Sequence, residues 1–184
     1  MGVHNYLIEG LSGTGKTTVA EALQRRGYHV IHGDRQFAYY GDPETGAPLD
    51  WPVFDSDSDK VAWGYRHWIW PVERVKALIA DRSHPISFFC GGSRNRHHFI
   101  ALFDKVFVLE ADAATLDRRL AARPADIFGG QPAEREFNTR LHASGENDPA
   151  NAIRIDATAP LADVIDAIIA ACEAGGGGDT AGSE

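Results

Sequence analysis

One segment constrains this chain more than any other. Residues 10–17 read Gly-Leu-Ser-Gly-Thr-Gly-Lys-Thr and match the pattern G-x-x-x-x-G-K-[ST] of a phosphate-binding loop. Glycines let successive backbone N–H groups turn inward towards phosphate oxygens. An apolar run at 5–9 precedes the loop, and a helical pattern at 16–26 follows it and presents a positive N-terminal end to the same anion. The segment, called the phosphate loop below, predicts a strand–loop–helix unit that binds nucleotide phosphates.

The residues of the phosphate loop have separate expected roles. Lys16 is placed to reach the β- and γ-phosphates as a catalytic cation, and Thr17 is placed to give its hydroxyl to Mg²⁺. The guanine-reading sequence Asn-Lys-x-Asp does not occur in the chain, so ATP is favoured over GTP. We therefore predict ATP and Mg²⁺ as cofactors. The predicted ATP contacts in this segment are Gly10, Ser12, Gly13, Thr14, Gly15, Lys16, Thr17 and Thr18.

Strand and helix patterns alternate along the chain. Strand patterns lie at 5–9, 28–32, 86–90, 106–109 and 152–155, and helical patterns lie at 16–26, 94–103, 112–123 and after Pro160. This alternation implies a parallel sheet of about five strands with helices on both faces. We predict one three-layer α/β domain over 1–174 and a glycine-rich, flexible tail over 175–184.

Two long stretches interrupt the alternation of strands and helices. Residues 33–81 contain all four tryptophans, and residues 124–150 are polar and contain two consecutive glycines. Insertions of this length in such folds usually cover a substrate. We therefore expect 33–81 to be an insertion on the acceptor side of the site and 124–150 to form a lid.

The inner glycine of the phosphate loop makes it resemble the loop of a known enzyme family. With Gly13 the loop reads G-x-x-G-x-G-K-T, a form that resembles the small P-loop kinases, among them adenylate, shikimate and gluconate kinases. Residues 116–123 resemble the R-x-x-x-R segment that leads into the lid of those kinases, and residues 155–160 resemble the loop that closes over adenine. The resemblance implies a P-loop kinase-like fold, with Arg119 against the adenine and Arg123 facing the phosphates as a catalytic residue.

The spacing of Arg119 and Arg123 agrees with this assignment but does not require it. Residues four apart lie on one face of a helix, and a face exposed to solvent is the other interpretation of the pair. Arg135 and Arg140 are further candidates within the lid.

Ligands of open parallel sheets bind beyond the carboxyl ends of the strands. Asp34 follows the strand at 28–32 and stands where several of the kinases keep a carboxylate beside Mg²⁺ and the acceptor hydroxyl. It is expected to act as a general base, as a metal ligand, or only as a turn residue. Arg35, beside it, is assigned to the acceptor site.

The strand at 86–90 ends in a second candidate acceptor segment. Gly91 and Gly92 allow the backbone to approach a ligand closely, and Arg94 and Arg96 follow them. Either arginine is placed to bind the transferring phosphate or an anionic acceptor, unless the segment is simply the entry to a helix. Many phosphate-loop ATPases hold Mg²⁺ through an acidic residue at the end of a strand. No acid stands here, so Asp34 is the best substitute, and a switch GTPase or motor ATPase is disfavoured.

Aromatic residues dominate 37–70, where they would form either a pocket that stacks a ring or the core of a helix. The adjacent His97 and His98 are not expected to form a metal site, because neighbouring side chains on a helix diverge by about 100°.

Composition excludes several classes of function. The chain has 18 basic and 26 acidic residues and a net charge of −8, which opposes binding to nucleic acid. No apolar run is long enough to span a membrane. Met1 to His4 lack the pattern of a signal peptide, and Cys90 and Cys172 look like core thiols, so we expect a cytoplasmic protein. The sequence does not indicate an oligomeric state.

These observations together predict an ATP- and Mg²⁺-dependent kinase that phosphorylates a hydroxyl of a small molecule. A nucleoside or nucleotide, a sugar-like polyol and an antibiotic natural product all fit as acceptors, and the aromatic insertion slightly favours a nucleoside. Two alternatives remain. One is a nucleotide-dependent ATPase or switch that regulates a protein partner, and the other is a polynucleotide 5′-end kinase, which the net charge disfavours.

Overall fold

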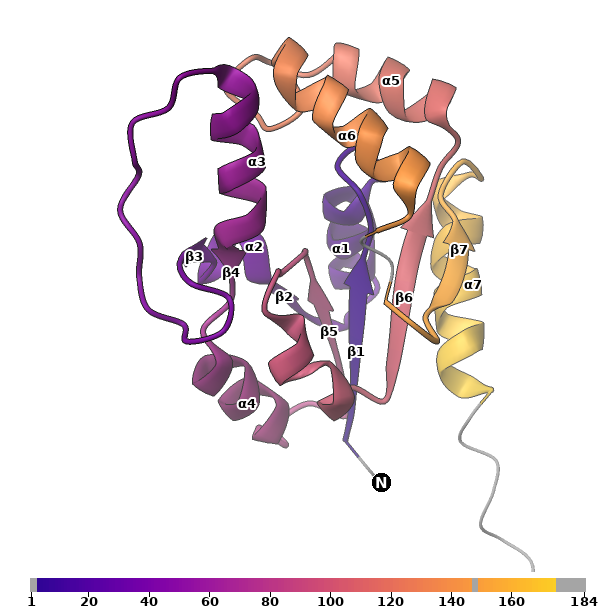
Figure 1. Cartoon of the computed structure of the whole chain (residues 1–184). Coiled ribbons are helices and arrows are strands. Elements are labelled where there is room, and N and C mark those ends of the chain that lie inside the picture. Colours follow the sequence, from indigo (N-terminus) through magenta and orange to yellow (C-terminus); the bar gives the residue numbers. More distant parts are fainter. Residues whose placement is uncertain (1–2, 147–148, 175–184) are drawn as a thin grey trace, which may run out of the picture.

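The computed structural model describes residues 3–146 and 149–174 and is built on a five-stranded sheet (Figure 1). The strands lie in the order β2 (His29–His32), β5 (Ile86–Cys90), β1 (His4–Glu9), β6 (Lys105–Glu110) and β7 (Ile153–Asp156). Every neighbouring pair in this sheet is parallel. The predicted parallel sheet of about five strands is confirmed, whereas the predicted tail at 175–184 lies outside the described residues.

Helices cover both faces of the sheet, because alternate residues of a strand point to opposite sides. Tyr6 and Ile8 of β1 pack with α1 (Lys16–Arg25) and α7 (Leu161–Glu173) on one face. Leu7, between them, packs on the other face with α4 (Val72–Ala80). Strands buried on both faces explain the continuous apolar runs in the sequence.

The segment predicted as a lid lies across the carboxyl ends of the strands (Figure 1). It follows α5 (Ala113–Ala121) and contains α6 (Pro132–Ser144), which packs against α3 (Asp57–His67). Asp112 caps α5 by accepting a hydrogen bond from the Thr115 amide, and Gln131 and Glu134 form a reciprocal capping box at the start of α6. The lid is therefore ordered by its own local sequence.

The insertion at 33–81 forms regular structure. It contains the short α2 (Gly33–Gln36), α3, α4 and a two-stranded antiparallel ribbon of β3 (Tyr39–Tyr40) and β4 (Trp68–Ile69). Trp70 follows β4 and is completely buried against the main sheet. This tryptophan anchors the insertion to the domain.

The helix predicted at 94–103 is wrong. The structure has two 3₁₀ turns there, η1 (Arg96–His98) and η2 (Ile100–Leu102), separated by Phe99 with φ −143°. The buried Asn95 side chain accepts a hydrogen bond from the Trp70 amide and donates one to the Trp70 carbonyl. A short polar side chain committed to another segment's backbone favours a turn over a continuous helix.

Within the described ranges, no helix combines the length and the apolar character needed to span a bilayer.

Candidate functional site

The phosphate loop connects β1 to α1 as the sequence predicts. Gly10 has φ +145°, and a Cβ there would lie 2.6 Å from the Leu109 carbonyl oxygen. Gly15 adopts the left-handed conformation at the N-cap, so α1 begins at Lys16. Thr17 and Thr18 are exposed in the first turn of α1. The two hydroxyls are therefore accessible to a ligand at the positive end of the helix.

Lys16 lies over its own loop. Its Nζ donates hydrogen bonds to the carbonyl oxygens of Gly10 (2.6 Å) and Leu11 (3.0 Å). Burial lowers the pKa of Lys16, and the carboxylates of Asp34 and Glu9 oppose this shift. An ammonium group removed from water attracts phosphate more strongly than an exposed one.

Asp34 is held in place by three donors. Its Oδ1 accepts hydrogen bonds from Trp68 Nε1 (3.1 Å), Trp70 Nε1 (3.3 Å) and the Gly92 amide (3.1 Å). All the bonds that the described residues give this carboxylate fall on Oδ1. Oδ2 is therefore available to a metal-bound water or a hydroxyl. A Cβ on Gly91 would lie 2.7 Å from Oδ1, so the absence of a side chain at 91 makes room for Asp34.

The two tryptophans that donate hydrogen bonds to Asp34 were not singled out from the sequence. They lie 34 and 36 residues after Asp34 in the chain, and no motif connects them to it. Only the fold of the insertion brings β4 and Trp70 back to the start of α2.

Arg94 is the predicted acceptor-site arginine that reaches the same place. Its guanidinium lies over the Tyr65 ring, 4.3 Å from the centroid, and donates a hydrogen bond to the Tyr65 hydroxyl. Its amide donates to the Trp68 carbonyl. Burial lowers the pKa of Arg94, and Tyr65 and Glu9 oppose the shift. Stacking and main-chain contacts thus fix this cation in the cleft.

Arg96 and Arg35 have other surroundings. Arg96 bonds to Oε2 of Glu9 at 3.1 Å, beneath the phosphate loop, and Glu9 is only 2% exposed. Burial raises the pKa of Glu9, and Arg96 opposes that shift. Glu9, the last residue of β1, was not singled out from the sequence. Arg35 is exposed and lies 3.7 Å from Glu21, outside the cavity described next.

The phosphate loop, the insertion and the lid meet around a cavity of about 310 Å³, called the Asp34 cavity. Charged groups, aromatic rings from the insertion and residues of the segment predicted as a lid all line it. Its lining includes Gly10, Ser12, Lys16, Asp34, Tyr40, Tyr65, Trp68, Gly92, Arg94, Phe128, Asn138 and Leu141. Of the predicted residues, the structure therefore brings together Gly10, Ser12, Lys16, Asp34, Gly92 and Arg94.

The lid is bonded directly to the phosphate loop. Arg123 donates to Ser12 Oγ at 2.7 Å and to the Phe128 carbonyl at 2.6 Å, and Asn138 donates to the Ser12 carbonyl at 3.2 Å. Burial lowers the pKa of Arg123, and Glu134 opposes the shift. Arg123 therefore contacts the loop instead of standing in solvent.

Arg119 also contacts the phosphate loop. It bonds to the Gly13 carbonyl at 3.3 Å and to the Ala157 carbonyl at 2.9 Å, so it joins the loop to the segment after β7. The fully solvated interpretation of Arg119 and Arg123 does not describe this arrangement.

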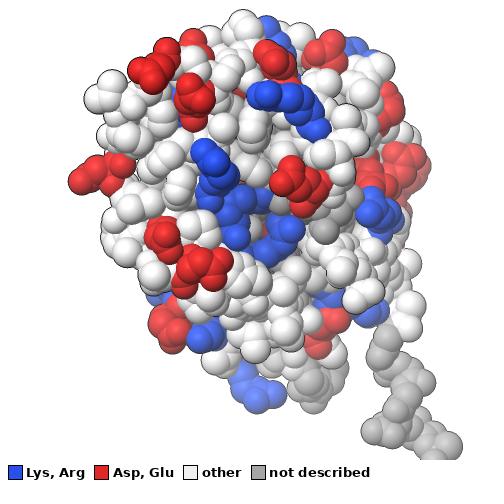
Figure 2. Space-filling model, viewed as in Figure 1, with Lys and Arg blue, Asp and Glu red and all other residues white. Residues whose placement is uncertain are grey.

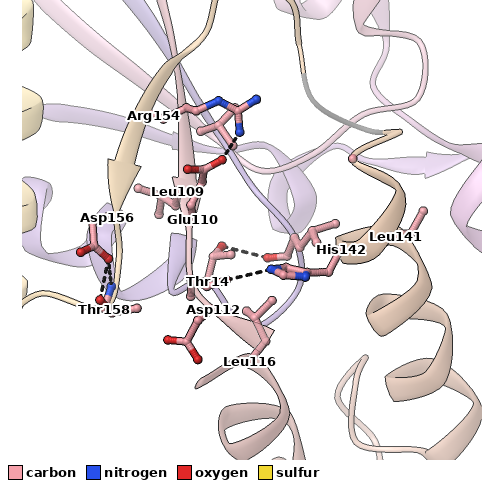
Figure 3. Close-up of a pocket in the computed structure, with 14 residues that line it drawn as sticks. Thr14, Leu109, Glu110, Asp112, Leu116, Leu141, His142, Arg154, Asp156 and Thr158 are labelled. Carbon is pink, nitrogen blue, oxygen red and sulfur yellow. Dashed lines mark hydrogen bonds and ion pairs between the residues drawn. The ribbon is translucent and has the colours of Figure 1, made fainter. Parts of the chain in front are cut away.

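Another cavity, of about 680 Å³, lies on the β6–β7 side of the loop (Figure 3). Its polar groups bond one another: Arg154 pairs with Glu110, Asp156 accepts from Thr158, and the His142 ring bonds to the Ala111 carbonyl. Neither Lys16 nor Asp34 lines it. Of these two cavities, Lys16 and Asp34 line only the smaller one, the Asp34 cavity.

The expectation that His97 and His98 point apart is wrong. In the 3₁₀ turn their ring centroids lie 4.1 Å apart. With Glu44 they offer three ligand atoms within 4.8 Å of one another, all on exposed residues. This group is of a kind that binds transition metals, and it lies outside the lining of the Asp34 cavity.

No protein-family model matches this chain, and no curated protein matches it. Solved structures do. A gluconokinase from Sinorhizobium meliloti 1021 is 21% identical with a TM-score of 0.53, over 93% of this chain and 92% of that chain. A sugar kinase from Janibacter sp. HTCC2649 is 18% identical with a TM-score of 0.55, over 93% and 95%. A deoxyadenosine kinase from M. mycoides is 13% identical with a TM-score of 0.50, over 92% and 99%. The chain therefore has the fold of the P-loop kinases, as the resemblance of its phosphate loop implied.

Proposed function

We propose that this protein is an ATP- and Mg²⁺-dependent kinase that transfers the γ-phosphoryl group to a hydroxyl of a small molecule. One observation carries the proposal: Lys16 of the phosphate loop and the three-donor carboxylate of Asp34 line a single cavity that lid residues close. A phosphate-binding cation and an oriented oxygen acceptor are the two groups that positional catalysis of phosphoryl transfer needs.

ATP would lie with its phosphates on residues 10–18. Arg119 bonds to both the loop and Ala157, which supports a place beside the adenine. Arg123 donates a hydrogen bond to Ser12 of the loop. If it gave up this bond, its guanidinium would be near enough to contact the phosphates.

The residues present fit Mg²⁺. The exposed Thr17 hydroxyl and the Oδ2 atom of Asp34 are hard oxygen donors, the type that this ion prefers. They would hold it directly or through water. When bound, Mg²⁺ neutralises charge on the β- and γ-phosphates.

The acceptor would enter the Asp34 cavity with its hydroxyl towards Asp34. Asp34 would orient this hydroxyl and take its proton, or would only orient it. Lys16 would stabilise the negative charge on the phosphoryl group during transfer. Phe128, Asn138 and Leu141 of the lid would keep bulk water out, since hydrolysis is the competing reaction.

The acceptor class rests on the lining of the cavity. Tyr40, Tyr65 and Trp68 offer aromatic surfaces beside Asp34, which supports an acceptor with a ring, such as a nucleoside or nucleotide. A sugar-like polyol and an antibiotic natural product are the other acceptors compatible with a cavity of this size. The similar structures are those of a gluconokinase, a sugar kinase and a deoxyadenosine kinase.

We place this reaction in the cytoplasm. Both cysteines are free thiols, Cys90 buried and Cys172 partly buried, which fits a reducing compartment.

The test is release of ADP from Mg·ATP in the presence of pooled nucleosides, nucleotides, sugars, and aminoglycoside-like or nucleoside antibiotics. We expect one pool to stimulate release and Lys16→Ala to abolish the stimulation. Lys76→Ala is the matched control, because Lys76 is an exposed lysine on α4 that pairs with Glu73. Slow release that no pool changes would contradict the kinase and favour the alternative of an ATPase or switch acting on a protein partner.

A further inference from the structure

We propose that Glu44, His97 and His98 form a surface site for a divalent transition-metal ion of the zinc class, and that this ion holds the insertion at 33–81 to the body of the domain. Each side chain offers one ligand atom, and the three atoms lie within 4.8 Å of one another. Two imidazoles and a carboxylate are a donor set that zinc commonly accepts. None of the three residues lines the Asp34 cavity, so the inference is independent of the proposed kinase function.

The ligands come from two segments that are far apart in the sequence. Glu44 lies in the turn after β3, within the insertion, whereas His97 and His98 belong to η1, after β5. Two contacts already join these segments: His97 Nε2 lies 3.6 Å from Glu44 Oε1, and His98 Nε2 bonds to the Pro43 carbonyl at 3.1 Å. Ligands of a tetrahedral zinc with bonds of about 2.0 Å lie about 3.3 Å apart. The spacing of Glu44 and His97 therefore needs little adjustment to take an ion.

The bond to Pro43 also prepares the His98 ring to be a ligand. A neutral imidazole that donates its proton from Nε2 keeps a lone pair on Nδ1. Metal-binding histidines almost always donate their other ring N–H to a carbonyl or a carboxylate, which fixes the tautomer and the orientation of the ring. His98 therefore already makes the supporting bond that a metal-binding histidine needs.

Both sides of the site are fixed by other contacts. Asp42 Oδ1 accepts hydrogen bonds from the amides of Glu44 (3.0 Å) and Thr45 (2.8 Å), which fixes the turn that carries the carboxylate ligand. On the other side, Asn95 and Phe99 flank η1, and both side chains are buried in the domain. The 3₁₀ turn between them holds the two histidine rings with their centroids 4.1 Å apart. Ligands that are already positioned lose less conformational entropy when they bind.

The charge of the insertion favours a cation at this place. Residues 42–59 contain six acidic residues and no lysine, arginine or histidine. In Figure 2, which is viewed as in Figure 1, acidic side chains lie along the side of the molecule that the insertion forms. A negative local potential raises the concentration of cations near the ligands. Glu44 and His97 are exposed, so an ion can reach them without any opening of the fold.

An ion at this site would join segments that lead into the Asp34 cavity. Tyr40 of β3 precedes Glu44 by four residues, and Arg94 precedes η1 by two, and both Tyr40 and Arg94 line that cavity. An ion bonded to both segments would therefore restrain the relative positions of the segments that carry these two residues.

The test of the site is calorimetric titration of the full chain with ZnCl₂ in the absence of nucleotide. Loss of even a residue that only supports a metal ligand usually weakens binding by about 10- to 100-fold. Glu44→Gln, His97→Ala and His98→Ala should therefore each weaken Zn²⁺ binding by about 100-fold or more. His4→Ala is the matched control, because His4 is a part-exposed histidine at the start of β1 that pairs with Asp104, and it should leave binding unchanged. Circular dichroism checks that every variant is folded.

Hydrogen exchange measured by mass spectrometry tests whether the ion holds the insertion. Zn²⁺ should slow the exchange of the amides at 41–47 in the unsubstituted protein and have no effect on them in His97→Ala. Absence of Zn²⁺ binding, or binding that all three substitutions leave intact, would overturn the site. Binding without slower exchange would overturn its role in holding the insertion. No readout here uses turnover, so a failure of the proposed kinase function would be recognised separately.

Discussion

The phosphate loop and the Asp34 cavity lie side by side, yet they are built in different ways. The loop consists of eight consecutive residues and uses mainly its own backbone, with glycines where the chain turns. The Asp34 carboxylate instead depends on Trp68, Trp70 and Gly92, which come from segments 34 to 58 residues away. A short run of consecutive residues can therefore form a phosphate site, whereas the acceptor site forms only when a whole insertion packs against the domain.

The largest expected effect is on kcat, and it comes from a substitution in the phosphate loop that should leave the stability of the fold unchanged. Lys16→Ala should lower kcat by about 100- to 1,000-fold, the scale of removing one preorganised cation or donor from a transition state. The thermal unfolding midpoint should stay close to that of Lys76→Ala, because among the described residues Lys16 donates hydrogen bonds only to carbonyls of its own loop. Steady-state ADP release and circular dichroism measure the two quantities. If Lys16→Ala retained its turnover, the loop would not be the catalytic phosphate site.

The second prediction tests whether the acceptor side depends on its supporting contacts. Asp34→Asn should lower kcat by about 100-fold with little change in the KM for ATP, since it removes the charge that orients or deprotonates the hydroxyl. Asp34→Ala should also lose about 1–3 kcal/mol of unfolding free energy, because the donors from Trp68, Trp70 and Gly92 lose their acceptor. Urea unfolding checks the stability. If both variants lose only stability, Asp34 is a turn residue, the alternative that the sequence left open.

A smaller effect is expected where α5 contacts the phosphate loop. Arg119→Ala should raise the KM for ATP about tenfold, because its bonds to Gly13 and Ala157 place it beside the nucleotide. Arg118→Ala on the same helix is the control, since Arg118 bonds only to Thr115, one turn back on α5, among the bonds described. Equal KM values for the two variants would remove Arg119 from the ATP site.

The smallest effect concerns pH and the cap of α5, the helix that carries Arg119. Hydrogen bonds from the Thr115 amide and hydroxyl lower the pKa of Asp112. A depressed carboxyl pKa contributes stability that is present above the ordinary pKa and is lost as the pH falls through the folded-state pKa. Asp112→Asn should flatten the decline in the urea midpoint between roughly pH 5 and pH 2. An unchanged slope would show that other carboxylates account for it.

The contrast between loop and cavity also explains what the sequence could predict. The phosphate loop and the parallel sheet depend on local patterns and strand order, and the structure agrees with them. The places of Arg119 at the adenine and Arg123 at the phosphates stay predictions. Asp34, Gly92 and Arg94 could be proposed because parallel strands end at one edge of a sheet. Their roles in catalysis stay predictions.

The missed features all depend on long-range partners. In the sequence, Glu9 is only a polar residue at the end of an apolar strand. Its partner in the structure, Arg96, lies 87 residues later in the chain. The helix expected at 94–103 failed for the same reason, since Asn95 bonds to the backbone of Trp70, a residue in a different segment. Local propensity carries no information about either partner.

The hydrogen bonds from Trp68 and Trp70 to Asp34 have a spectroscopic consequence. Two indoles share one carboxylate oxygen, so a metal ion or hydroxyl that draws on Asp34 changes the electric field at both chromophores. The other two tryptophans, Trp51 and Trp63, contact each other at a tilt of 42° with ring centroids 5.0 Å apart, and neither is among the described donors to Asp34. Replacing that pair with phenylalanine would leave intrinsic emission that arises only from the Asp34 site, so the protein would report its own occupancy without a label.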